Sequence, residues 1–118
     1  MITLFQLNKA GKEIKIIFLR CMSKNINSQI EHLIVRHHWL LQKGRLYKQF
    51  RFKKFEYVMD FVNRLSSKIN ESDHHPKMII NFNSLGIELF SFDENRITKK
   101  DLDMASYIDI AFKNFSYE

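Results

Sequence analysis

Apolar residues recur along the chain at two spacings, and each spacing predicts a type of element. In residues 28–37, 55–69 and 98–115 they fall every third or fourth position, as on one face of an amphipathic helix. The first segment opens with Ser-x-x-Glu and the last with Thr-x-x-Asp, which are forms of the capping box. The chain therefore predicts three helices.

The segments between these helices contain alternating stretches and short apolar runs, which are both typical of strands. Residues 46–52 have the spacing of a strand, with Leu46, Phe50 and Phe52 on one side, and should form a hairpin with residues 39–42, with Lys43-Gly44 as the turn. Residues 78–82 and 85–90 predict a second pair, with Asn83-Ser84 as the tight turn. The order is helix, two strands, helix, two strands, helix. This order predicts an α+β fold with a four-stranded antiparallel sheet and helices on one face, which leaves the other face or an edge of the sheet free for another subunit.

Composition limits the class of protein. The chain has 118 residues, 45% of them hydrophobic, with one Pro and three Gly, so no flexible linker divides it into two domains. No apolar run reaches the roughly 18 residues of a membrane span, and we expect no membrane partner. The single cysteine, Cys21, excludes an internal disulfide framework and a cysteine-rich zinc site, and it favours a reducing, cytoplasmic location.

The positive charge is concentrated at the N-terminus. Residues 1–28 carry five basic side chains against Glu13 alone, whereas residues 29–118 carry 14 basic and 12 acidic ones. We therefore divide the chain into a basic extension, residues 1–28, and a domain, residues 29–118. Residues 1–22 fit an organelle presequence (mitochondrial, for example), an extra strand or helix on the domain, or a stretch upstream of a true start at Met22. Residues 14–19 could form a short strand. The nearly balanced domain argues against a nucleic-acid partner, and a basic leader that binds nucleic acid is the weaker alternative.

Two pairs of adjacent histidines are candidates for chemistry. In the loop His74-His75-Pro76 both imidazoles could face one pocket, and their pKa of about 6.5 suits proton transfer near neutrality. The other interpretation is a pair of solvated loop histidines. His37-His38 stands at a predicted helix end, where capping at the surface accounts for it. Without a His-x₃-His or a cysteine pair, we expect no metal site.

Residues 44–55, the amphipathic helix and Asp73-His74-His75-Pro76 resemble pterin-4a-carbinolamine dehydratases. The resemblance covers residues 29–113, and Trp39, which is expected in the core, stands where the family has a Trp. It implies dehydration of 4a-hydroxytetrahydropterin (4a-hydroxytetrahydrobiopterin) to quinonoid dihydropterin. This reaction recycles the cofactor of aromatic amino-acid hydroxylases. The resemblance further implies no cofactor, and assembly into a homodimer or homotetramer. Some animal members also bind a homeodomain transcription factor.

The resemblance also implies site residues. His74 and His75 would be the catalytic acid and base. The implied substrate-binding residues are Asn70, Glu71, Asp73, Pro76, Phe82, Ser91, Phe92 and Asp101. For Asp101 we favour helix capping, and for Phe82 a place in the core or the pocket wall.

Two positions depart from the family pattern. Phe92 replaces a third histidine and cannot transfer a proton, and Asn70 replaces an acid, for which Glu71 could substitute. Because one general acid or base contributes about 10²–10⁴-fold, we expect reduced activity rather than none. The alternative is a catalytically weak member that acts as a pterin-binding or protein-partner module, like a transcription coactivator.

Overall fold

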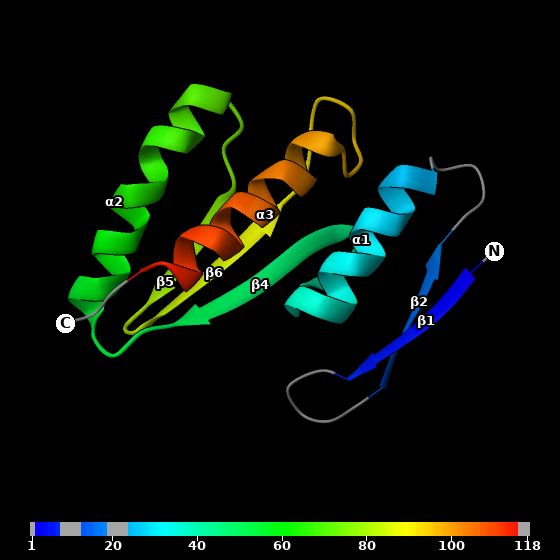
Figure 1. Ribbon diagram of the computed structural model, residues 1–118, viewed down its shortest axis with the longest axis horizontal. Coiled ribbons are helices and arrows are strands. Elements are labelled where there is room, and N and C mark those ends of the chain that lie inside the picture. Colours follow the sequence, from blue (N-terminus) through cyan, green and yellow to red (C-terminus); the bar gives the residue numbers. More distant parts are fainter. Residues whose placement is uncertain (1, 8–12, 19–23, 116–118) are drawn as a thin grey trace.

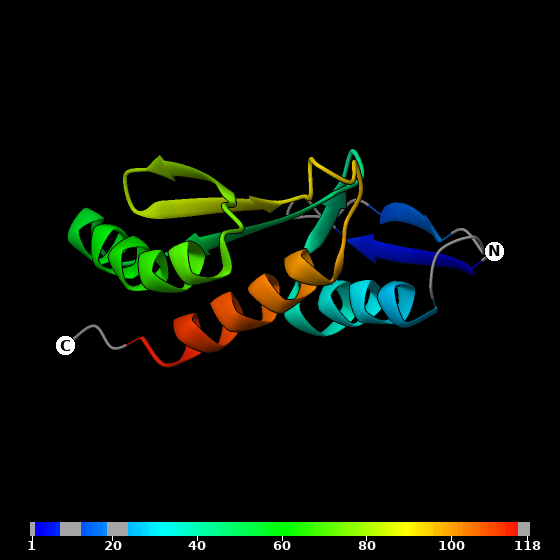
Figure 2. The same cartoon turned by 90° about the horizontal axis from the view of Figure 1, so that it is seen from above.

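The computed structural model describes residues 2–7, 13–18 and 24–115. Its elements are β1 (Ile2–Leu7), β2 (Glu13–Phe18), α1 (Lys24–His37), β3 (Leu40–Gln42), β4 (Arg45–Arg51), α2 (Phe55–Ser72), β5 (Lys77–Asn81), β6 (Ser84–Leu89) and α3 (Lys99–Lys113). Four strands form one antiparallel sheet in the order β3-β4-β6-β5. All three helices lie on one face of this sheet (Figure 2). The predicted α+β architecture is therefore confirmed.

The N-terminal segment contains a hairpin of its own. β1 and β2 pair antiparallel from Ile2 with Phe18 to Leu7 with Glu13, as a two-stranded sheet separate from the larger one (Figure 1). A short strand was expected over residues 14–19, and β2 covers all of that segment except Leu19, which lies outside the described residues. So does Met22, the proposed alternative start.

The first helix begins earlier than its sequence predicts. α1 starts at Lys24, so Ser28 lies inside the helix and cannot be its N-cap. The reason is Ile26, which packs against the core and continues the apolar stripe of Ile30 and Leu33 one turn upstream. The helix ends at His37 as expected. His38 then adopts a left-handed φ of 63°, and the Trp39 N–H donates to the Leu33 carbonyl at 3.1 Å. The left-handed residue reverses the direction of the chain, and this bond satisfies one of the last carbonyls of the helix.

The two hairpins close with tight turns. Lys43 and Gly44 have φ values of 52° and 76°, as a type I′ turn requires, and Gln42 pairs with Arg45. In the second hairpin Asn81 pairs with Ser84, so the turn is Phe82-Asn83 rather than the predicted Asn83-Ser84. The shift by one residue takes Phe82 out of the strand and gives it a φ of 54°.

The core lies between the sheet and the helices. Trp39 is fully buried, as expected, and its Nε1–H donates to Asp109 Oδ2 at 2.9 Å. One end of the core is a cluster of phenylalanine rings whose neighbouring centroids lie 5.0–6.1 Å apart. We call this the aromatic cluster; its members are Phe50, Phe52, Phe61, Phe112 and Phe115.

Candidate active site

The start of α3 places a buried carboxylate beside the loop between α2 and β5. Thr98 is the N-cap of α3, and its backbone N–H donates to Asp101 Oδ2 at 3.0 Å. The Thr98 side chain in turn accepts the Asp101 backbone N–H, which completes a capping box. The predicted capping role of Asp101 is confirmed, and its side chain is fully buried.

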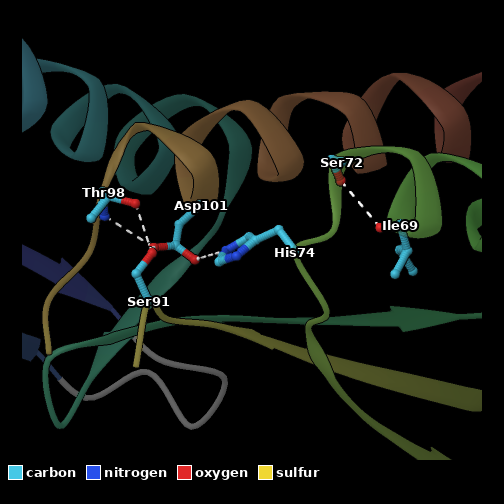
Figure 3. Close-up of polar contacts among 6 residues, drawn as sticks. All are labelled: Ile69, Ser72, His74, Ser91, Thr98 and Asp101. Carbon is cyan, nitrogen blue, oxygen red and sulfur yellow. Dashed lines mark hydrogen bonds and ion pairs between the residues drawn. The ribbon is translucent and has the colours of Figure 1, made fainter. Parts of the chain in front are cut away.

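Asp101 has more partners than a helix cap needs. Its Oδ2 accepts the Ser91 hydroxyl at 2.7 Å, and its Oδ1 lies 2.6 Å from His74 Nε2 (Figure 3). Ser91 Oγ also lies 2.7 Å from Thr98 Oγ1. We call these four residues the Asp101 network: His74, Ser91, Thr98 and Asp101. They come from the segment before β5, the segment after β6 and the start of α3, so the fold brings them together.

The donors and acceptors of the Asp101 network indicate which of its atoms carry protons. An ionised carboxylate only accepts hydrogen bonds, so the Ser91 hydroxyl donates to Asp101 and the Thr98 hydroxyl donates to Ser91. For the same reason His74 Nε2 carries the proton that it shares with Asp101. In the neutral ring Nδ1 is then the free acceptor. The network thus fixes both the orientation of His74 and the nitrogen that is left for chemistry.

His75 has a different environment from its neighbour. The side chain of His74 is 12% exposed, whereas that of His75 is 60% exposed. Its Nδ1 lies 4.0 Å from a carboxylate oxygen of Asp73, which is itself 95% exposed. Among the described residues no hydrogen bond joins the two imidazoles. His74 therefore turns inward to Asp101, and His75 turns toward solvent.

Three other candidate residues lie near His75 along the chain at the end of α2. Asp73 caps this helix with a left-handed φ of 51°, and its N–H donates to the Asn70 carbonyl at 3.3 Å. Asn70 is exposed, and so is Glu71, whose carboxylate lies 3.7 Å from Lys68 Nζ. Pro76 is half-buried just before β5. The side chains of Asn70, Glu71 and Asp73 are thus accessible from solvent.

Phe92 follows Ser91 and is 66% exposed. Its ring centroid lies 5.1 Å from that of Phe90 and 4.9 Å from the guanidinium carbon of Arg45. Arg45 lies at the same distance from the Phe90 ring and donates to Glu88 Oε1 at 3.0 Å. Sequence reasoning missed Arg45, because nothing local to residue 45 indicates that it meets residue 92.

Phe82 does not join this group. It lies past the end of β5, whereas the two histidines lie before its start, and seven residues of extended chain from His75 span roughly 20 Å. The side chain is 69% exposed, so the expected place in the core is wrong. The physical reason is the one-residue shift of the turn.

Two further findings concern metal ions and membranes. In the ranges that the structure describes, no group of three or more His, Cys, Asp or Glu side chains could hold a metal ion. None of the described helices is both long and apolar enough to cross a membrane.

A profile of the family described as pterin 4 alpha carbinolamine dehydratase matches residues 21–111. The chain belongs to this family. A relative from Picosynechococcus sp., named as a candidate pterin-4-alpha-carbinolamine dehydratase, is 34% identical over 71 residues, which cover 60% of this chain and 77% of that protein. A relative of the same name from Burkholderia pseudomallei is 32% identical over 89 residues, which cover 74% and 85%.

Solved structures agree on the fold. A protein from Brucella melitensis, described as a transcriptional coactivator/pterin dehydratase, matches with a TM-score of 0.68 and 22% identity, over 79% of this chain and 98% of that one. A pterin dehydratase-like protein identified as a RuBisCO assembly factor in the alpha-carboxysome matches with a TM-score of 0.53 and 21% identity, over 62% and 87%. The named roles of these two proteins differ, so the shared fold alone does not fix the function.

Proposed function

We propose that the protein dehydrates a 4a-hydroxytetrahydropterin to the quinonoid dihydropterin. The C4a–O bond breaks, N5 loses its proton, and a double bond forms between C4a and N5 as water leaves. This elimination needs one group that donates a proton to the hydroxyl and one that accepts a proton from N5. The observation that carries the proposal is the buried pairing of His74 with Asp101 in a chain of this family.

His74 is suited to the role of base. Its Nε2 is held by Asp101, so Nδ1 is the nitrogen available to accept the N5 proton. When the ring gains that proton, the carboxylate 2.6 Å away stabilises the positive charge, as the aspartate of a serine-protease triad does for its histidine. Ser91 and Thr98 would act as positioning residues, because their hydrogen bonds fix Asp101 rather than reaching the substrate.

His75 is suited to the role of acid. Its ring is mostly exposed, so it can deliver a proton to the leaving hydroxyl and be reprotonated from water. The exposed groups near it, Asn70, Glu71 and Asp73, would hydrogen-bond the polar edge of the pterin. Phe92 would supply an apolar face for stacking. Phe82 has no place in this arrangement because of its distance along β5.

The partners follow from the same proposal. The substrate is a small pterin, and the reaction needs no metal or organic cofactor. A cytoplasmic location remains a prediction from the sequence.

We also propose that the chain forms a homo-oligomer through β5. β5 is an edge strand of the sheet, and Ile79 and Ile80 on it are 50% and 40% exposed. An apolar edge with unpaired backbone groups favours pairing with a second strand. Sedimentation of wild type, Ile79→Lys and the control Ile110→Lys, an exposed residue on α3, tests this. We expect only Ile79→Lys to shift the population toward monomer, and a monomeric wild type would contradict it.

The activity is tested with 4a-hydroxytetrahydrobiopterin generated in situ, by following its dehydration in the ultraviolet. We expect wild type to exceed the uncatalysed rate, and His74→Gln and His75→Ala each to lose about 10²–10⁴-fold of the acceleration. Gln at position 74 keeps an N–H for Asp101, and His38→Asn is the matched control because Asn tolerates the left-handed backbone there. Wild type at the uncatalysed rate would refute the proposal.

A second candidate is a binding module with little turnover. It is favoured by Phe92 and Asn70, which stand where the family pattern has a histidine and an acid. Two solved structures of this fold are described as a transcriptional coactivator/pterin dehydratase and as a RuBisCO assembly factor. Tight pterin binding by wild type without acceleration of dehydration would favour this candidate.

A further inference from the structure

A second pair of histidines meets on α1, away from the Asp101 network. His32 and His37 bring their Nε2 atoms to 3.3 Å, with ring centroids 5.0 Å apart and ring planes at 61°. Both rings reach solvent, and the side chain of His37 is 44% exposed. From the sequence alone, capping at the surface accounts for His37, and nothing connects it with His32. A separation of five residues is not a usual ligand spacing on a helix, so the pattern gave no signal.

The ring geometry fits two lone pairs that converge on one point. Two imidazole nitrogens each about 2.05 Å from a shared zinc ion, at an angle of roughly 107°, lie 3.3 Å apart. In that arrangement the centroids would be roughly 5.1 Å apart, whereas rings pointing head-on at the same nitrogen separation would place them at roughly 5.5 Å. The observed 5.0 Å matches the convergent arrangement.

The far side of His37 faces a fixed anion. Its Nδ1 lies 4.0 Å from Asp109 Oδ2, and Asp109 is held by Trp39 Nε1 at 2.9 Å and Lys48 Nζ at 2.6 Å. At this separation the two groups do not hydrogen-bond, so Asp109 acts on His37 only as a nearby negative charge. Lys48 balances part of the charge of Asp109, so this carboxylate adds only a modest attraction for a cation. The C-terminal end of α1, where His37 lies, adds a favourable dipole for a cation.

The surroundings leave room for further ligands. A hollow of about 380 Å³ opens beside His32, and its described lining comes from α1: Ser28, Glu31, His32, Val35 and Arg36. Water molecules in this space could complete the coordination of an ion that has only two protein ligands.

We propose that His32 and His37 bind one divalent transition-metal ion of the Zn²⁺ class through their Nε2 atoms, with water as the remaining ligands. The site is separate from the proposed dehydratase chemistry and requires no metal in that reaction. Without an ion, one N–H···N hydrogen bond between the rings accounts for the same contact. The two alternatives therefore differ in whether a metal ion is bound, and this can be measured.

Titration of the full chain with ZnCl₂, followed by calorimetry, tests the site. We expect one Zn²⁺ per chain, with affinity at least about tenfold weaker in His32→Ala and in His37→Ala, because each removes one of two protein ligands. His38→Asn and His75→Ala are the controls, and they should bind within about twofold of wild type. Circular dichroism checks that each variant is folded, and His32→Ala carries the test if the change at the helix end disturbs α1.

Copper gives a second readout of the ligands. With one equivalent of Cu²⁺, electron paramagnetic resonance of wild type should show coupling to two imidazole nitrogens, and that of His32→Ala to one. The proposal is overturned if wild type binds no ion, or if His32→Ala and His37→Ala bind as wild type does. Dehydratase activity does not enter either readout, so failure here would leave the proposed function untouched.

Discussion

The two ends of α3 are held in different ways. At its start, Asp101 is buried with three hydrogen-bond partners from side chains and backbone: His74, Ser91 and Thr98. At its other end, Phe112 and Phe115 pack into the aromatic cluster against Phe61. Ring packing tolerates small changes of shape, whereas a buried carboxylate requires every partner in place. The difference indicates that the aromatic end supplies stability and that the polar end supplies a defined geometry for His74.

The largest effect should come from breaking the aromatic end. We expect Phe61→Ala to lower the free energy of unfolding by about 3–5 kcal/mol, since the ring is fully buried and leaves a cavity. That is a large part of the roughly 5–15 kcal/mol of a typical domain. Phe55→Ala, 46% exposed on the same helix, is the control and should cost less than about 1 kcal/mol in a urea titration. Equal losses for the two variants would contradict the assignment of stability to the cluster.

An intermediate effect should come from breaking the polar end without touching His74. Ser91→Ala removes the hydroxyl that joins Thr98 to Asp101, and it leaves buried groups short of a partner, so we expect a loss of about 1–3 kcal/mol. The rate of dehydration should fall with KM nearly unchanged, because Ser91 positions His74 through Asp101. Ser106→Ala, exposed on α3, is the control for both measurements. An effect confined to KM would instead indicate direct contact between Ser91 and the substrate.

The smallest effect on stability should come from Phe92→His. The side chain is 66% exposed, so we expect a change within about 0.5 kcal/mol. A third imidazole beside the network should still raise the dehydration rate, by up to about 10²-fold. Phe92→Leu, measured in parallel, controls for the loss of the ring. An unchanged rate in Phe92→His would show that position 92 does not face the reacting atoms.

Local patterns predicted most of the fold. The apolar stripe of α2, the turn at Lys43-Gly44 and the capping motif of α3 are all encoded within a few residues, so each was predictable. The N-terminus of α1 was predicted wrongly because the Ser28 motif matched a capping box by chance while Ile26 extended the helix. The place of Phe82 was wrong for a similar reason, since alternation alone does not show where a strand ends.

The site was less predictable, because its contacts join distant parts of the chain. Adjacent residues such as His74 and His75 look alike in sequence, and only Asp101, 27 positions away from His74, distinguishes them. The contact between Phe92 and Arg45 depends in the same way on tertiary packing. The residue types thus indicated which chemistry is possible, whereas the fold was needed to show which side chains lie close enough to act together.

The central claim is that Asp101 acts on the reaction through His74, and a double-mutant cycle on the dehydration rate tests it most directly. The variants are His74→Gln, Asp101→Asn and the double mutant; Asn keeps an oxygen for Thr98 and Ser91 but removes the charge. We predict that each single change lowers the rate and that the double mutant is no slower than His74→Gln, because the two residues work as a unit. Losses that multiply in the double mutant would contradict this account, since they would mean that Asp101 and His74 act independently.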